Sequence, residues 1–138
     1  MTLVGEDSVG RPIASTDQDG IAHLEGSKCP ACGDVRVPAR VRCPNDLTLC
    51  ERLLCSGRGT VYEVVKVSLV PQGFAAPFWA GYIDLDEGAR LFAQVAAGDD
   101  GRPPEARDRV VLTLAPLRQR DGEEVQGPLF RVPDGGFA

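Results

Sequence analysis

The sequence predicts a mainly-β protein in which a short metal-binding ribbon precedes a small closed barrel. Cysteines beside tight-turn residues fill the front third of the chain, and apolar residues alternate with period two from about residue 60. No long amphipathic helix is indicated. The 138 residues suit one modest domain with a small appendage.

The chain divides into three segments by composition. Residues 1–23 are rich in Gly, Asp, Ser and Thr with isolated apolar positions, which predicts an extended or partly disordered N-terminal arm. Residues 24–56 combine cysteines with Pro and Gly, which is typical of tight turns joined by short extended pieces. We expect residues 57–138 to form the β-barrel domain.

The barrel is expected to contain about five antiparallel strands. The first covers 60–70, with Val61, Val65, Val67 and Leu69 on the inward face. Strands at 79–85 and 90–96 are joined by a hairpin loop at 86–88, in which Gly88 can take a positive φ.

The rest of the barrel follows a polar loop at 98–108. We expect a fourth strand at 109–115 with Val110, Leu112 and Leu114 inward, and a short closing strand at 129–132. A closed barrel would leave no exposed sheet edge.

The motif Cys29-Pro-Ala-Cys32-Gly33 has the form of a zinc knuckle. Two thiolates two residues apart can bind one ion, and zinc favours four such ligands in a tetrahedral arrangement. Cys43-Pro-Asn-Asp46 has the shape of a second knuckle, but Asp46 stands where a second cysteine is expected. The predicted ligand set is Cys29, Cys32, Cys43 and Asp46, around a structural zinc that supplies folding free energy.

Three alternatives to this ligand set remain open. Cys50 could replace Asp46, although its spacing from Cys43 is wide for a knuckle, or the site could lose its metal. The cysteines could also pack as small hydrophobic side chains, and this is the better interpretation of Cys55 at an inward strand position. A redox role for Cys29 and Cys32 is disfavoured because no βαβ pattern surrounds them.

The net charge of −5 argues against nucleic-acid binding, which depends on Lys and Arg contacts to phosphate. No apolar run reaches the roughly 20 residues of a membrane span, and the N-terminus shows no signal-peptide pattern. An odd number of cysteines without an export signal indicates metal ligands or buried thiols. We therefore expect a cytoplasmic protein.

Several other residues could serve a site. Arg58 and Arg90 flank turns and could meet a CoA phosphate, although solvated turn charges are commoner. The loop at 71–79 is unusually apolar, and Phe74 and Trp79 in it could form a docking surface or cap the barrel. The single His23 is a poor general base in a loose arm. Turn chemistry explains the carboxylates of residues 84–87.

A set of motifs resembles one family in order and spacing. The motifs are GSKCPACG at 26–33, Pro38, Arg40, CP at 43–44, SGRGTVY at 56–62 and DLDEG at 84–88. Together they resemble the acyl-CoA-associated OB-fold family with an N-terminal rubredoxin-like zinc ribbon, long labelled a domain of unknown function. The match runs from about residue 26 to about residue 130.

The resemblance implies a rubredoxin-like zinc ribbon followed by a five-stranded OB-fold barrel. Family members are small partner subunits or fused domains of thiolase-superfamily enzymes, and the catalytic Cys and His belong to the partner chain. The small subunit supports the partner's active site and shares its acyl-CoA. This sequence departs from the pattern at Asp46, and it lacks the helical N-terminal segment of many members.

The leading hypothesis is therefore a non-catalytic subunit of a thiolase-type acyl-CoA enzyme, with no residues of its own in catalysis. An alternative is a nucleic-acid-binding protein, since ribbons and small barrels both serve that use. The charge and the absence of aromatics interleaved with basic residues argue against it. A standalone metalloenzyme is disfavoured by the closed ligand set.

Overall fold

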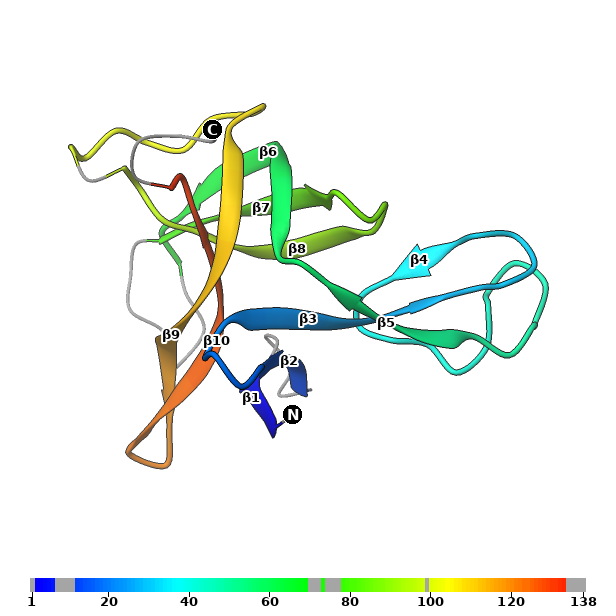
Figure 1. Cartoon of the computed structure of the whole chain (residues 1–138). Helices are drawn as coiled ribbons and strands as arrows, with labels where there is room; N and C mark the ends of the chain where they lie inside the picture. Colours follow the sequence, from blue (N-terminus) through cyan, green and yellow to red (C-terminus); the bar gives the residue numbers. More distant parts are fainter. Residues whose placement is uncertain (1, 7–11, 70–72, 74–77, 99, 134–138) are drawn as a thin grey trace.

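The computed structural model describes residues 2–6, 12–69, 73, 78–98 and 100–133 (Figure 1). The regular structure of these residues is all β, so the mainly-β prediction is confirmed. They form a sheet that carries the ribbon and a closed barrel, and the ribbon extends to one side of the barrel (Figure 1). Within the described residues no helix is long and apolar enough to cross a membrane.

The first sheet contains five strands. They are β1 (Thr2–Glu6), β2 (Pro12–Thr16), β3 (Ala22–Lys28), β4 (Val35–Arg36) and β5 (Glu51–Cys55). The order is β1-β2-β3-β4, and β5 also pairs with β3, all antiparallel. The ribbon residues between β3 and β5 are turns and short extended pieces, as predicted.

The described part of the N-terminal arm is a β-hairpin and not a loose segment. A tight turn follows β2, in which Asp17 Oδ1 accepts the N–H groups of Asp19 and Ile21 at 2.9 and 3.0 Å. Ile13 and Ala14 of β2 are buried in the core. The sequence did not predict this ordered hairpin, because few of its residues are apolar. The core residues that Ile13 and Ala14 pack with lie mostly in later strands of the chain.

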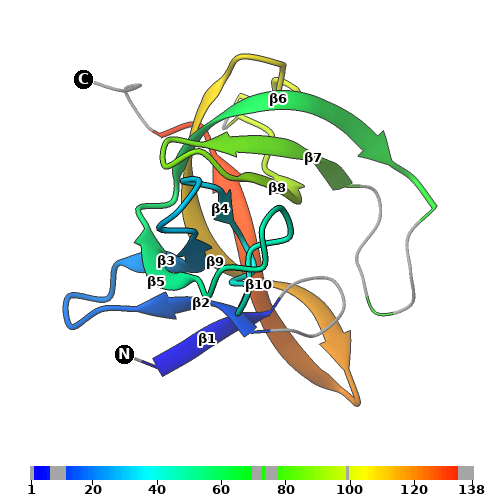
Figure 2. The same ribbon diagram turned by 90° about the vertical axis from the view of Figure 1, so that its right-hand side faces the viewer.

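Five strands close the barrel. They are β6 (Arg58–Val67), β7 (Phe78–Leu85), β8 (Arg90–Val95), β9 (Arg109–Arg120) and β10 (Glu123–Arg131), in the closed order β10-β8-β7-β6-β9. In the turned view, β6, β7 and β8 lie next to one another across the top (Figure 2). The predicted hairpin loop at 86–88 is present, with a bond of 2.9 Å from Gly88 N–H to the Leu85 carbonyl.

One pair of neighbours in the barrel is parallel, which corrects the all-antiparallel prediction. β10 runs parallel to β8, with Leu129 opposite Gln94 and Phe130 opposite Val95. Around a closed ring of five strands, antiparallel pairing cannot alternate without a break, because five is odd. At least one pair must therefore be parallel.

The predicted inward face of the first barrel strand is wrong beyond Val61. Val61 is buried, but Val65 and Leu69 are exposed and Val64 packs on the core instead. The cause is a β-bulge, where the register shifts between Val61 and Glu63. An extra residue in one strand moves the following side chains to the opposite face.

One hydrophobic core joins the barrel to the first sheet. Phe130, Ile83 and Val110 from the barrel pack in the same cluster as Leu24 of β3 and Cys55 of β5. Val110 is fully buried, and Leu112 and Leu114 pack against the cluster, as predicted. The interpretation of Cys55 as a buried core thiol is also confirmed.

The ribbon is also tied to the barrel by hydrogen bonds at the junction. Glu87 Oε2, on the loop between β7 and β8, accepts the N–H of Ser56 at 2.9 Å. The N–H of Asp86 donates to the carbonyl of Arg58 at 3.0 Å. The loop therefore fixes the segment where β5 passes into β6.

We predict that Phe130→Ala lowers the free energy of unfolding by about 3–5 kcal/mol, because Phe130 is fully buried and its removal leaves a cavity. Phe92→Ala is the matched control, since this ring lies 55% exposed on β8. Urea unfolding followed by intrinsic fluorescence measures both. Equal effects of the two substitutions would contradict this description of the core.

Candidate metal centre

The first cysteine pair lies in a tight turn between β3 and β4. The N–H of Gly33 donates to the Cys29 carbonyl at 2.9 Å, and the N–H of Cys29 donates to the Asp34 carbonyl at 2.9 Å. Gly33 has a φ of 79°, which glycine adopts without a Cβ clash. The N–H of Cys32 lies 3.5 Å from the Cys29 sulfur, so an amide faces a prospective thiolate.

The same two backbone bonds recur in the second turn. The N–H of Leu47 donates to the Cys43 carbonyl at 2.9 Å, and the N–H of Cys43 donates to the Thr48 carbonyl at 2.8 Å. The N–H of Asn45 lies 3.4 Å from the Cys43 sulfur. The two turns are therefore equivalent, and Leu47, with a φ of 62°, takes the place of Gly33.

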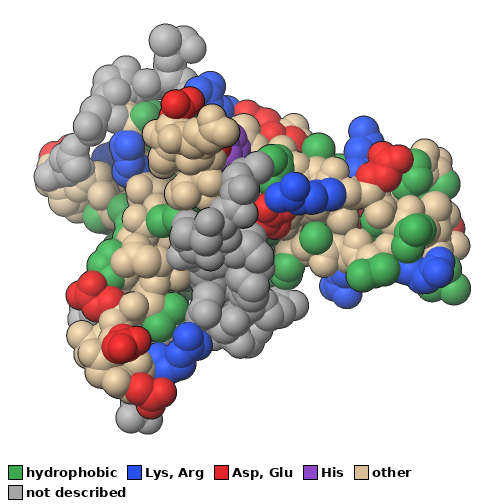
Figure 3. Space-filling model, turned by 60° about the horizontal axis from the view of Figure 1, so that its bottom comes forward, with side chains coloured by type: hydrophobic (Ala, Val, Ile, Leu, Met, Phe, Trp, Pro, Cys, Tyr) green, Lys and Arg blue, Asp and Glu red, His purple; other side chains and the backbone are tan. Residues whose placement is uncertain are grey.

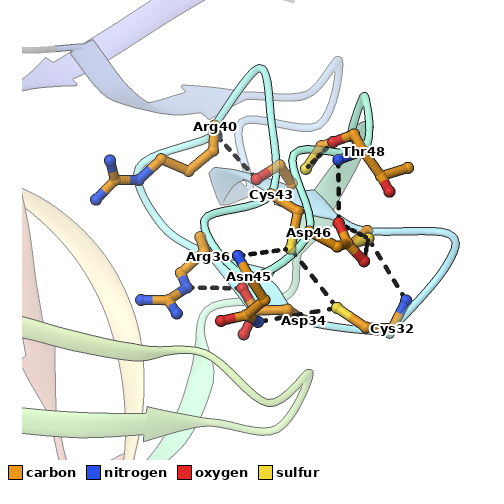
Figure 4. Close-up of polar contacts among 11 residues, drawn as sticks. Cys32, Asp34, Arg36, Arg40, Cys43, Asn45, Asp46 and Thr48 are labelled. Carbon is orange, nitrogen blue, oxygen red and sulfur yellow. Dashed lines mark hydrogen bonds and ion pairs between the residues drawn. The ribbon is translucent and has the colours of Figure 1, made fainter.

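The two turns bring four ligand atoms together. The three sulfurs of Cys29, Cys32 and Cys43 and a carboxylate oxygen of Asp46 all lie within 4.8 Å of one another (Figure 4). Cys32 Sγ is 3.6 Å from Cys43 Sγ, and Cys29 Sγ is 3.6 Å from both Asp46 oxygens. Cys29 and Cys43 are buried, whereas Cys32 and Asp46 face solvent.

The donor set and its spacing fit a tetrahedral zinc ion. With Zn–S bonds of about 2.3 Å, two sulfurs at a tetrahedral angle lie about 3.8 Å apart. The Cys32 and Cys43 sulfurs, 3.6 Å apart, are close to that value. The N–H of Thr48 holds Asp46 Oδ1 at 3.0 Å and so orients the carboxylate toward the sulfurs.

Cys50 is not a member of this cluster. Its sulfur is 3.8 Å from the Thr48 carbonyl, and its side chain is half-buried. Burial raises the pKa of the Cys50 thiol, and the negative groups nearby raise it further. Of the two alternatives for the fourth position, the structure places Asp46, and not Cys50, among the other three ligand atoms.

The thiols of the cluster differ in their readiness to ionise. The backbone N–H of Asp34, followed by the Cys43 thiol, lowers the pKa of Cys32. Burial raises the pKa of Cys43 to about 11. Without a metal, the first thiolate of this pair therefore forms on Cys32, and a cation is needed to hold both in the ionised state.

Arg90 already has partners within the chain. Its Nε and Nη2 donate to the two Asp84 oxygens at 2.6 and 3.2 Å, and its guanidinium carbon lies 3.7 Å from the centre of the Tyr62 ring. Arg58 lies on β6 at the same end of the barrel and is exposed. Among the described residues, its guanidinium makes no ion pair.

The sequence did not single out Arg109, which binds Asp86 through two nitrogens at 2.7 and 2.9 Å. The hydrogen bonds from Arg109 are the main reason that the pKa of Asp86 lies below its usual range. Burial works in the opposite direction, and the positive charges of Arg109 and Arg58 lower the pKa further. Arg109 Nη1 also donates to Thr60 at 3.0 Å. These residues lie on β6, on β9 and on the loop between β7 and β8, so no local pattern could reveal their pairing.

The remaining predicted residues have simple surroundings. His23 Nε2 lies 3.0 Å from Asp17 Oδ2, in the N-terminal hairpin. Trp79 is half-buried in β7, with Lys66 Nζ 6.0 Å from its ring. Phe74 lies outside the described residues. The carboxylates of residues 84–87 do more than shape a turn, because they hold Arg90, Arg109 and the ribbon junction.

Two family models match the chain. Residues 22–48 match the rubredoxin-like zinc ribbon domain of ChsH2, and residues 54–112 match its C-terminal OB-fold domain. The chain is 34% identical over 122 residues to benzoylsuccinyl-CoA thiolase subunit BbsA of Thauera aromatica, covering 82% of this chain and 79% of that protein. The chain belongs to the ChsH2 family of zinc-ribbon and OB-fold proteins.

Two further proteins are similar to most of the chain. A DUF35 domain-containing scaffold protein of Methanothermobacter thermautotrophicus is 31% identical over 106 residues, which cover 74% of this chain and 78% of that protein. A solved structure titled Ltp2-ChsH2(DUF35) aldolase matches with a TM-score of 0.60 and 26% identity. That match covers 79% of this chain and 84% of that chain. The family and fold predicted from the motifs are confirmed.

We predict that alkylation of the metal-free chain at pH 8 modifies Cys32 before Cys55. Cys32 is exposed and its pKa is lowered, whereas Cys55 is fully buried and burial raises its pKa to about 11. Reaction with iodoacetamide, quenched at intervals and mapped by peptide mass spectrometry, gives the order. Modification of Cys55 before Cys32 would contradict the described burial.

Proposed function

We propose that this chain is a non-catalytic subunit of a thiolase-type acyl-CoA enzyme, supporting the active site of a larger catalytic chain. The observation that carries the proposal is the similarity over both domains to a protein named as a thiolase subunit. A second relative, named as a scaffold protein, is similar over nearly the same length. A structure named for an aldolase together with ChsH2 points to the same kind of assembly.

The positions of the nucleophilic side chains support a non-catalytic role. Three of the five cysteines belong to the metal-ligand cluster, and Cys55 is enclosed in the core. The single histidine, His23, bonds Asp17 in the N-terminal hairpin. A thiolase-type reaction needs a cysteine with a base beside it, and we assign that pair to the partner chain.

We further propose that Cys29, Cys32, Cys43 and Asp46 hold a structural zinc ion. When bound, zinc would cross-link the two turns and keep both exposed and buried thiolates ionised. Four protein ligands leave no position open for water or substrate, so the ion would not act as a Lewis acid here. Unpaired cysteines suit a reducing compartment, and we place the complex in the cytoplasm.

Of the two arginines predicted to meet CoA, Arg58 fits the role better. Arg90 would have to leave Asp84 and the Tyr62 ring to bind a phosphate. Arg58 has no such commitment among the residues described, and it lies beside the fixed loop at 86–88. We propose that Arg58 contacts a CoA phosphate when the partner's acyl-CoA reaches the interface.

The proposal predicts a stable complex with a thiolase-family enzyme subunit from the same organism. Co-expression with a tag on this chain should yield a stoichiometric complex by size-exclusion chromatography with light scattering. The complex, and not this chain alone, should cleave or form an acyl-CoA thioester. A chain that stays monomeric beside that soluble enzyme subunit, or that is active without it, would contradict the proposal.

We predict that the purified wild-type chain holds one zinc ion per molecule. Asp46→Ala should weaken zinc binding by at least about 10- to 100-fold. That is the loss expected when a residue that only hydrogen-bonds to a metal ligand is removed, and Asp46 is proposed to be a ligand itself. Asp46→Cys should bind at least as tightly as wild type. Cys50→Ala is the control, because Cys50 lies outside the cluster.

Competition with a chromophoric chelator measures the affinities, and plasma emission spectrometry gives the zinc content. Weaker binding in Cys50→Ala with unchanged binding in Asp46→Ala would reverse the assignment of the fourth ligand. Well-folded protein without zinc would refute the metal site.

A further inference from the structure

Leu47 occupies a backbone position that suits glycine. Its φ is 62°, in the left-handed region, where a bulky side chain is sterically disfavoured. The equivalent residue of the first turn is Gly33, with a φ of 79° and the same two backbone hydrogen bonds around it. The turn therefore needs a positive φ but does not need a leucine.

Packing within the chain does not explain Leu47 either. Its side chain is 69% exposed, and it is not among the residues that pack against the core. A strained position that neither the backbone nor the core requires points to a role outside the chain. The leucine side chain is what a glycine could not supply.

Two more aliphatic side chains are exposed on the same short hairpin. Val41 is 75% exposed and Leu49 is 59% exposed. The Cys50 N–H donates to the Val41 carbonyl at 2.8 Å, and a β-bridge joins Arg42 to Leu49, so Arg42 and Leu49 share one face of the hairpin and Val41 lies on the other. We call Leu47 and Leu49 the knuckle tip; at this end of the molecule hydrophobic and charged side chains are exposed side by side (right in Figure 3).

Two arginines lie close in sequence to the residues of the knuckle tip. Arg40 and Arg42 flank Val41, and both are exposed and free of carboxylate partners among the described residues. Arg42 Nη1 donates instead to the Leu47 carbonyl at 3.0 Å, which holds the guanidinium beside the leucine. Residues 28–52 hold five basic and three acidic residues, although the whole chain has a charge of −5.

We propose that the knuckle tip docks into an apolar pocket with an acidic rim on the thiolase-family enzyme subunit. This inference rests on the proposed function and adds the contact surface and its chemistry. Leu47 enters the pocket, with Leu49 beside it, and Arg40 and Arg42 meet the carboxylates of the rim. Apolar anchors surrounded by charged groups are the usual arrangement of a protein interface.

Charge and symmetry argue against a second copy of this chain as the occupant. A tip-to-tip contact would bring Arg40 and Arg42 of one copy against those of the other, and like charges repel. A contact between the tip and another surface would be heterologous, and such contacts form rings or open filaments instead of closed dimers.

The test compares Leu47→Gly with Ile21→Ala, an exposed aliphatic residue of the N-terminal hairpin. We expect Leu47→Gly to keep its zinc content and thermal stability, because glycine relieves the strain. It should nevertheless bind the co-expressed enzyme subunit at least about tenfold more weakly, as expected for an interface anchor. Ile21→Ala should bind as wild type does. Biolayer interferometry with the purified enzyme subunit measures the affinities.

Leu47→Asn provides a second variant, because asparagine tolerates a positive φ and lacks the apolar side chain. Unchanged affinity of both variants, in a wild-type chain that binds the enzyme subunit, overturns the knuckle tip and leaves the proposed function intact. Loss of zinc or a lowered melting temperature in both variants would assign Leu47 a structural role and also overturn it. A wild-type chain that does not bind the enzyme subunit overturns both proposals.

The charged rim has its own test. Arg40→Glu combined with Arg42→Glu should slow association and reverse its salt dependence, since the rim would then repel the pocket. Association unaffected by this double change, or self-association of the wild-type chain that Leu47→Gly abolishes, would contradict the named occupant.

Discussion

The convergence of Cys29, Cys32, Cys43 and Asp46 is the contact on which the shape of the ribbon depends. Between β3 and β5 the described chain buries only Cys29, Val37 and Cys43 as hydrophobic residues. So small an apolar area cannot offset the conformational entropy of ordering more than twenty residues. The ribbon must therefore be held by the backbone bonds of its two turns and, as we propose, by an ion bound at this cluster, and not by a core of its own.

The barrel is stabilised in a different way, by ordinary burial and by closure. Phe130 and Val110 fill its interior, and the parallel pairing of β10 with β8 removes the last free edges. Its core continues into β2, β3 and β5, so the base of the ribbon is anchored although its tip is not. A rigid base with an exposed tip is a suitable geometry for presenting side chains to another protein.

The two turns of the ribbon have the same backbone hydrogen bonds but differ in two side chains. Gly33 and Leu47 occupy matching positions, as do Cys32 and Asp46. The second turn has a carboxylate, Asp46, where the first has a thiol. It also has a leucine, Leu47, at a positive φ where the first has a glycine. Both departures lie on the exposed side of the cluster, where side chains of the ribbon can meet solvent or another chain.

Local patterns in the sequence were enough to predict the fold class, the ribbon, the barrel strands and the closeness of Cys29, Cys32, Cys43 and Asp46. Cysteine spacing and period-two alternation are local properties, so they can be recognised without knowing which residues are in contact in the fold. The same patterns left the choice between Asp46 and Cys50 open, because one-dimensional spacing does not say which side chain turns toward the sulfurs.

Only the tertiary structure decided the remaining features. The bulge after Val61 could not be predicted, because both faces of that strand carry apolar residues and one inserted residue exchanges them. The pairing of Arg109 with Asp86 joins residues 23 positions apart, one on β9 and one on the loop between β7 and β8. The left-handed φ of Leu47 was invisible for the same reason: nothing local distinguishes an exposed, strained leucine from one that packs into a core.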